Sequence, residues 1–133
     1  MDQELKILQR EVFQAGTVII HEGEPGKRAF IIETGKVAIW RDIDGKRGTL
    51  GVVDEGGIFG EMALIDNQPR MASASAITDT TCIIVGEDIF KAKLDEADPF
   101  LVWLLRIFAR NIRSLAVHME ADDTTPGGDA GDG

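Results

Sequence analysis

The sequence has very few residues that bind metals or form cross-links. Cys82 is the only cysteine among 133 residues, which excludes an intramolecular disulfide and a multi-cysteine metal site. His21 and His118 are the only histidines, and they lie too far apart in the sequence to indicate a histidine metal cluster. Cys82 begins the apolar run 82–85, so we expect it to be a small buried side chain. These absences favour a protein of a reducing compartment without a bound metal or cofactor.

Long hydrophobic runs are also missing. No stretch approaches the roughly 20 apolar residues that a membrane span requires. Residues 1–13 carry charges throughout and lack the continuous apolar core of a signal peptide. We therefore expect a cytoplasmic protein with no membrane segment in this chain.

Positive charge is scarce. The chain has 14 Lys and Arg against 23 Asp and Glu, a net charge of −9, and five of the acidic residues fall within residues 120–133. Proteins that bind nucleic acid broadly present a basic face, which this composition disfavours. A single basic residue in a concave site remains compatible with a small anionic ligand.

What is present favours one small, mainly β domain. We expect residues 1–119 to form the domain and residues 120–133 to be a disordered, acidic, glycine-rich tail. Leu5, Leu8 and Val12 have helical spacing and predict a short N-terminal helix over residues 2–12. Short β-prone runs between glycine turns then predict an α+β fold built on an eight-stranded β-roll or jelly roll. The clearest strands are residues 17–20, 29–33, 36–40, 49–53, 72–77 and 81–85, with a hairpin turn at Asp44-Gly45.

Two helices are predicted after the strands. Residues 87–94 form a short amphipathic candidate, and Asp98-Pro99 supplies an N-cap followed by proline at the first helical position. The second helix should run over residues 99–119, with Trp103 in the core or an interface and with Arg106, Arg110 and Arg113 on a solvated face. Its apolar stripe comprises Leu101, Leu104, Leu105, Phe108, Ile112, Leu115 and Met119.

The segment 57–76 carries the chemistry. It passes from a glycine turn into a helix-prone piece, residues 61–65, and leaves through residues 66–69 to Arg70 at the start of a strand. Backbone N–H groups at the start of a helix attract anions, and an arginine can add charge-assisted hydrogen bonds to a phosphate. Glu61 would repel a phosphate, but a carboxylate accepts hydrogen bonds well, so Glu61 suits a ligand with a hydroxyl beside its phosphate.

These residues strongly resemble the phosphate-binding cassette of the cyclic-nucleotide-binding domain family. That family includes the catabolite activator protein, the regulatory subunits of cyclic-AMP-dependent protein kinase and the ligand domains of cyclic-nucleotide-regulated channels. The matching residues are Phe59-Gly60-Glu61-Met62-Ala63-Leu64, then a loop, then Pro69-Arg70 before a small-residue strand. The turns at residues 23–26 and 35–37 are also similar, and the resemblance covers about residues 10–118. We call residues 57–72 the cassette.

The resemblance implies a role for each site residue. Arg70 would contact the exocyclic phosphate oxygens and Glu61 the ribose 2′-hydroxyl, while Leu50 and Val52 would contact the ribose and base. The rest of the cradle is expected from Gly60, Met62, Ala63, Met71 and Ala72. The family's cyclic-GMP-selective domains typically carry threonine after the cassette arginine. Met71 stands there and favours cyclic AMP, with cyclic GMP as the alternative ligand.

We expect a regulatory binding module that transmits occupancy through its last helix, forms a homodimer through that helix and signals to an unknown effector. The sequence shows no recognisable catalytic arrangement and predicts that the protein is not an enzyme. Too few residues follow Met119 for a DNA-binding domain in this chain. Two alternatives stay open. One is a degenerate family member acting as a protein-interaction module, and the other is the sensor fragment of a larger transcription regulator or channel.

Overall fold

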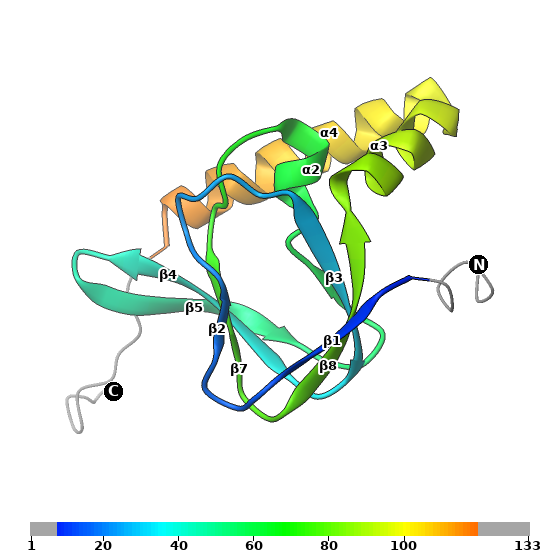
Figure 1. The fold of residues 1–133 in the computed structure, drawn as a ribbon. Helices are drawn as coiled ribbons and strands as arrows, with labels where there is room; N and C mark the ends of the chain where they lie inside the picture. Colours follow the sequence, from blue (N-terminus) through cyan, green and yellow to red (C-terminus); the bar gives the residue numbers. More distant parts are fainter. Residues whose placement is uncertain (1–7, 120–133) are drawn as a thin grey trace.

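The computed structural model describes residues 8–119. Two antiparallel four-stranded sheets form a β-roll, which confirms the predicted mainly β class and its eight strands. One sheet has the order β1-β8-β3-β6 and the other β2-β7-β4-β5 (Figure 1). The strands are β1 (Arg10–Phe13), β2 (Val18–Ile20), β3 (Arg28–Thr34), β4 (Val37–Ile43), β5 (Lys46–Val53), β6 (Ile58–Phe59), β7 (Ser73–Ala76) and β8 (Thr80–Gly86).

Turn chemistry and alternating apolar residues explain the strands. Asp44 and Gly45 both have positive φ, at 54° and 83°, as a two-residue hairpin turn between β4 and β5 requires. The inward side chains form a core between the sheets, in which the rings of Phe30 and Phe59 stack with centroids 4.9 Å apart. Cys82 is fully buried in that core, as predicted.

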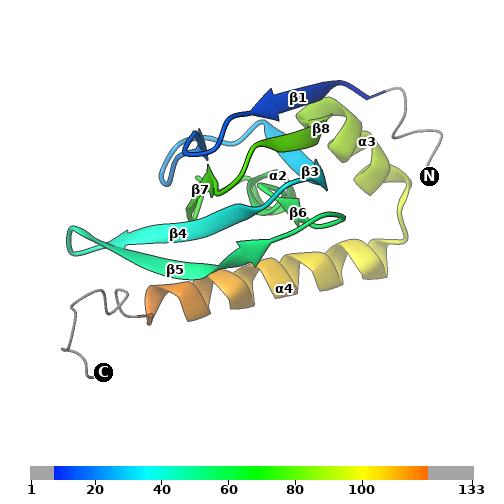
Figure 2. The ribbon, with the colours of Figure 1, turned by 90° about the horizontal axis from the view of Figure 1, so that it is seen from below.

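Three helices are described, α2 (Met62–Asp66), α3 (Glu87–Glu96) and α4 (Pro99–Val117). Figure 1 shows all three gathered at the same end of the roll, and in Figure 2 α4 runs alongside β5. The Asp98 side chain accepts a hydrogen bond from the Phe100 amide, which confirms the predicted N-cap. Within residues 8–119 no helix has the length and apolar character needed to cross a membrane.

The predicted N-terminal helix is wrong over residues 10–12. These residues belong to β1, which pairs antiparallel with β8 from Arg10 opposite Ile83 to Phe13 opposite Thr80. As a strand at the sheet edge, these residues form backbone hydrogen bonds with β8, about 70 residues further along the chain. The stability gained from this pairing exceeds the weak helical preference that the spacing of three apolar residues indicates. Most of the other residues of that predicted helix lie outside the described residues. The predicted acidic tail, residues 120–133, lies wholly outside them.

The predicted apolar stripe of α4 exists, but most of its side chains are exposed rather than buried. Phe108 is 53% exposed and Leu115 is 74% exposed, whereas Ala109 and Ala116 are buried against the roll. The small side chains are the buried ones and α4 packs mainly against α2, while most of the larger apolar side chains remain exposed. Trp103, predicted in the core or an interface, is also exposed.

Candidate functional site

The cassette includes β6, and the chain turns sharply at Gly60, directly after that strand. Gly60 has a φ of 81°, a left-handed conformation that favours glycine. A Cβ at this position would lie 2.8 Å from Nη1 of Arg70, so the space is also closed to a side chain. Helix α2 then starts at Met62 and ends before Asn67, which takes the left-handed C-cap conformation with a φ of 56°. The predicted cassette helix is therefore confirmed, one residue later than expected.

Arg70 lies at the centre of the site and is only 9% exposed. Its Nη1 donates to the carbonyl of Gly60 at 2.7 Å, and its Nη2 donates to the carbonyl of Arg28 at 2.9 Å. Burial, followed by the nearby charge of Arg28, lowers the pKa of Arg70, while Glu24 and Glu61 oppose that shift. A guanidinium remains protonated in proteins, so the site holds a fixed, oriented positive charge.

Gly26 is a site residue that the sequence analysis missed. A Cβ added to it would lie 2.7 Å from Cζ of Arg70 and 2.7 Å from Cβ of Ala63. The bare glycine therefore lets the turn between β2 and β3 close over the arginine and α2. The sequence showed residues 23–26 only as a turn, because the close approach involves Ala63 and Arg70, which lie 37 and 44 residues further along the chain.

Glu61 supplies the opposite charge. It precedes the first residue of α2, and its carbonyl accepts hydrogen bonds from the Leu64 and Ile65 amides. Burial raises the pKa of the Glu61 carboxyl, while a backbone hydrogen bond and the charge of Arg70 lower it. A carboxylate in a partly desolvated position beside a cation is a strong acceptor for a ligand hydroxyl.

A cavity of about 150 Å³ opens between the cassette and the roll. Seven of the nine predicted site residues line it, namely Gly60, Glu61, Met62, Ala63, Arg70, Met71 and Ala72. Leu50 and Val52 do not. They line a neighbouring groove of about 450 Å³ between β5 and α4, which also includes Ile112 and Leu115.

The cavity and the groove adjoin each other. Ile39, Val53 and Met71 line both of them. The cavity by itself is smaller than the roughly 300 Å³ at which drug-sized ligand pockets begin. A ligand with two parts would therefore place its polar part beside Arg70 and extend its second part into the apolar groove.

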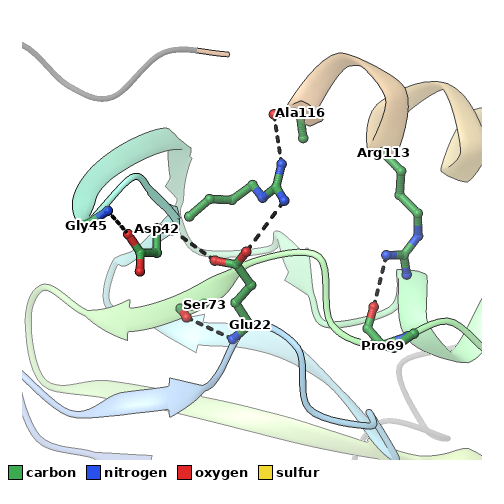
Figure 3. Close-up of polar contacts among 8 residues, drawn as sticks. Glu22, Asp42, Gly45, Pro69, Ser73, Arg113 and Ala116 are labelled. Carbon is green, nitrogen blue, oxygen red and sulfur yellow. Dashed lines mark hydrogen bonds and ion pairs between the residues drawn. The ribbon is translucent and has the colours of Figure 1, made fainter. Parts of the chain in front are cut away.

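The structure also corrects the prediction for Arg113. This side chain was expected on a solvated face, but it is partly buried and pairs with the Asp66 carboxylate at the end of α2. It also donates to the carbonyl of Pro69 at 2.9 Å (Figure 3). A second arginine, Arg41 on β4, donates to the carbonyl of Ala116 at 2.9 Å. The C-terminal half of α4 is therefore bonded both to β4, through Arg41, and to the cassette, through Arg113.

The other candidate groups do not come together in the described part of the chain. His21 and His118 are both exposed, and residues 8–119 contain no cluster of three or more His, Cys, Asp or Glu side chains suited to a metal ion. Burial raises the pKa of the Cys82 thiol to about 11, as expected for a thiol in an apolar core.

Comparisons with known proteins agree with this architecture. The family model described as "Cyclic nucleotide-binding domain" matches residues 10–97, and the chain belongs to that family. A "CRP-like cAMP-activated global transcriptional regulator" of Mycobacterium tuberculosis is 35% identical over 109 residues, which cover 81% of this chain and 49% of the regulator. A "cAMP-dependent protein kinase regulatory subunit" of Hypocrea atroviridis is 31% identical and covers 90% of this chain, but the match spans only 23% of that subunit.

Solved structures show the same fold. The cAMP-bound form of the EAL enzyme Bd1971 has a TM-score of 0.78 and 36% identity, covering 82% of this chain and 29% of that chain. The catabolite activator protein of Thermus thermophilus has a TM-score of 0.70 and 30% identity, covering 87% of this chain and 55% of that one. The chain thus spans about half or less of the length of these relatives.

Proposed function

We propose that this chain is a sensor domain that binds cyclic AMP between Arg70 and Glu61 and transmits occupancy through α4. The observation that carries the proposal is the buried guanidinium of Arg70, held by two backbone carbonyls at one wall of a cavity that Glu61 also lines. Charge complementarity of this kind suits a ligand that carries an anion and a hydroxyl close together.

The proposed roles follow from the hydrogen-bonding capacity of each group. A guanidinium has five N–H donors, and two of those in Arg70 are directed to the Gly60 and Arg28 carbonyls. The remaining donors can bond the cyclic phosphate without breaking the contacts that orient the side chain. Glu61 would accept the ribose 2′-hydroxyl, and the backbone around Gly60, Ala63 and Met71 would complete the phosphate cradle.

The nucleobase would extend into the groove between β5 and α4. The groove is lined mainly by apolar side chains, including Leu50, Val52 and Ile112, so it would hold the base by burial. Met71 has no hydroxyl for the guanine edge, which supports a preference for cyclic AMP. The relative Bd1971 has been solved both in a cAMP-bound and in a cGMP-bound form, so cyclic GMP is the matched comparison ligand.

Helix α4 is the proposed output element. Leu101, Leu105, Phe108, Ile112 and Leu115 follow one another at spacings of four and three residues. This is the pattern of a coiled-coil seam, and all five side chains are at least 40% exposed. We propose that a second copy of the chain covers this stripe in a homodimer. Ile112 and Leu115 also line the groove, so ligand and partner chain would meet on the same half of α4.

Calorimetry on nucleotide-stripped protein tests the proposal. One binding site per chain is expected for cyclic AMP, with a weaker response to cyclic GMP. Absence of heat and of a thermal shift with either ligand at millimolar concentration would contradict the proposal and favour the protein-interaction module. Equal affinities for cyclic AMP and cyclic GMP would agree with the proposed binding site but would remove Met71 as the basis of selectivity.

A further inference from the structure

The C-terminal half of α4 is attached to the loop that leads into Arg70. We call residues 67–69, between the end of α2 at Asp66 and Arg70, the exit loop. Nε and Nη2 of Arg113 bind the two carboxylate oxygens of Asp66, and Nη1 donates to the carbonyl of Pro69 at 2.9 Å. One guanidinium thus holds the last residue of α2 and the last residue of the exit loop. The two charged side chains are only 21% and 17% exposed, so solvent screens this pair less than an ordinary surface ion pair.

Few apolar contacts hold the exit loop. Asn67, Gln68 and Pro69 are all exposed, so burial of apolar surface contributes little to their position. The chain after the loop is held separately, because the Arg70 amide donates to the Glu24 carbonyl and the Gly23 amide donates to the Arg70 carbonyl, both at 2.8 Å. Within the loop the Asn67 amide donates to the Ala63 carbonyl and the Gln68 amide to Oδ1 of Asp66, and Arg113 adds the hydrogen bond to Pro69, directly before the phosphate-binding arginine.

We propose that Arg113 is the positioning residue through which docking of α4 sets the geometry of the phosphate site. The proposal rests on the function proposed above and names the contact through which that site would be regulated. When α4 is docked, Arg113 holds the exit loop so that Arg70 reaches the Gly60 and Arg28 carbonyls and faces the cavity. When α4 moves away, the contacts of Arg113 with Asp66 and with Pro69 are lost together.

Such a contact couples the docking of α4 to the binding of the phosphate. If the docked helix favours the loop geometry that the phosphate requires, the bound phosphate favours the docked helix by the same factor. A ligand shifts a conformational equilibrium only through its different affinities for the two states. The Arg113–Asp66 pair provides that difference without requiring any direct contact between Arg113 and the nucleotide.

A double-mutant cycle on the full chain tests the coupling. Cyclic AMP affinity is measured by calorimetry for the wild type, Arg113→Gln, Asp66→Asn and the double variant. Each single variant should bind about fivefold or more weakly, within the usual range of couplings between sites. The cyclic AMP affinity of the double variant should be no lower than that of the single variant with the lower affinity, because both changes break the same contact. Arg110→Gln is the control, since it removes the same charge from an exposed position one turn earlier.

Amide exchange in the ligand-free protein separates positioning from general stability. The amides of Asn67, Gln68 and Arg70 are hydrogen-bonded in the structure and should exchange faster in Arg113→Gln but not in Arg110→Gln. Arg113→Lys should be intermediate, because an ammonium can pair with Asp66 but lacks the planar fork that also reaches Pro69. A lowered melting temperature with unchanged affinity and unchanged exchange in the exit loop would overturn the proposal. If the wild type bound no cyclic nucleotide, the proposed function would fail, and the exchange rates would still decide whether Arg113 positions the loop.

Discussion

At the scale of single residues, the site depends on an arginine that the protein itself orients. Arg70 is buried, and its guanidinium is held by hydrogen bonds to two backbone carbonyls of the protein itself. Pre-orientation lowers the entropy lost on binding, because the side chain does not have to be ordered by the ligand. The residues around Arg70 therefore affect affinity through its position as well as through direct contact.

Replacement of Arg70 should be the most damaging single change for binding. Arg70→Ala removes charged hydrogen bonds worth about 1.5–3 kcal/mol, which corresponds to roughly a tenfold to hundredfold loss of cyclic AMP affinity. Arg70→Lys should recover only part of the loss, since an ammonium cannot reproduce the planar fork. Calorimetry gives the affinities, and circular dichroism confirms that each variant is folded. Normal binding by Arg70→Ala would show that the phosphate site lies elsewhere.

Gly26 should tolerate no side chain. Gly26→Ala places a Cβ 2.7 Å from both Cζ of Arg70 and Cβ of Ala63, so the arginine or α2 must move. We expect a loss of cyclic AMP affinity of about tenfold, equivalent to about 1.4 kcal/mol. Gly86→Ala is the matched control, because a Cβ there meets no atom within 4 Å. Equal affinities of the two variants in a titration would contradict this account of the turn.

Glu61 should lower the stability of the ligand-free protein at neutral pH. Burial raises the pKa of its carboxyl, so the folded protein binds that proton more tightly than the unfolded chain does. The resulting stability is present below the unfolded pKa and is lost as the pH rises through the folded value. Glu61→Gln should therefore melt a few degrees higher than the wild type at pH 7. The difference should shrink at pH 4, and the variant should bind cyclic AMP more weakly. A lower melting temperature for Glu61→Gln at pH 7 would show that ionised Glu61 stabilises the fold.

At the scale of elements, α4 has two different faces. Ala109 and Ala116 are buried and Arg113 pairs with Asp66 of α2, whereas Leu101, Phe108 and Leu115 are exposed. The attachment combines small buried residues with arginine hydrogen bonds to Asp66, Pro69 and Ala116. Polar contacts of this kind can exchange with water, which makes α4 better suited to move than the strands of the core.

Removal of α4 should weaken binding without unfolding the roll. The main core cluster lies between the two sheets and contains no α4 residue, so a chain ending at Asp98 should remain folded. It should bind cyclic AMP more weakly, because the groove loses its α4 wall and the exit loop loses Arg113. Circular dichroism and calorimetry on the truncated chain measure the two effects. In the intact chain, hydrogen exchange over residues 99–117 should slow when cyclic AMP is added. Equal affinity of the truncated chain would make α4 a structural cap.

At the scale of the whole molecule, the exposed large apolar side chains of residues 8–119 gather on α4 more than on any other element. Large apolar side chains usually occur singly on the surface of a monomer, whereas here they recur along one helix at coiled-coil spacing. The proposed second copy would cover them. Dimer formation would then also place the groove residues Ile112 and Leu115 at or beside the interface.

Charge placed in this stripe should separate the chains. Phe108→Glu and Leu115→Glu should shift the sedimentation behaviour from dimer to monomer, because an unpaired charge would be buried at the interface. Val12→Glu is the control, since Val12 is also exposed, at 68%, but lies on β1. The expected loss is at least tenfold in the dimerisation constant for each stripe variant. A wild-type chain that sediments as a monomer at high concentration would contradict the proposed dimer.

Local signals in the sequence were sufficient for much of the fold. The hairpin at Asp44-Gly45, the N-cap at Asp98 and the short cassette helix each depend on neighbouring residues, and the structure confirms all three. The cassette residues were predicted from a resemblance to a family, and seven of the nine predicted site residues line one cavity. The function of these residues stays a proposal until a ligand is measured.

The sequence by itself determined the family, the class of fold and the residues of the cassette, because these are written in short contiguous patterns. Only the tertiary structure decided that residues 10–12 form a strand, that Gly26 packs on Arg70 and that Arg113 holds Asp66 from 47 residues away. It also decided which side of α4 faces the roll, since two apolar faces of different size are both compatible with the same helical spacing. Contacts between distant segments depend on how the whole chain packs, and local propensity carries no information about which segments will meet.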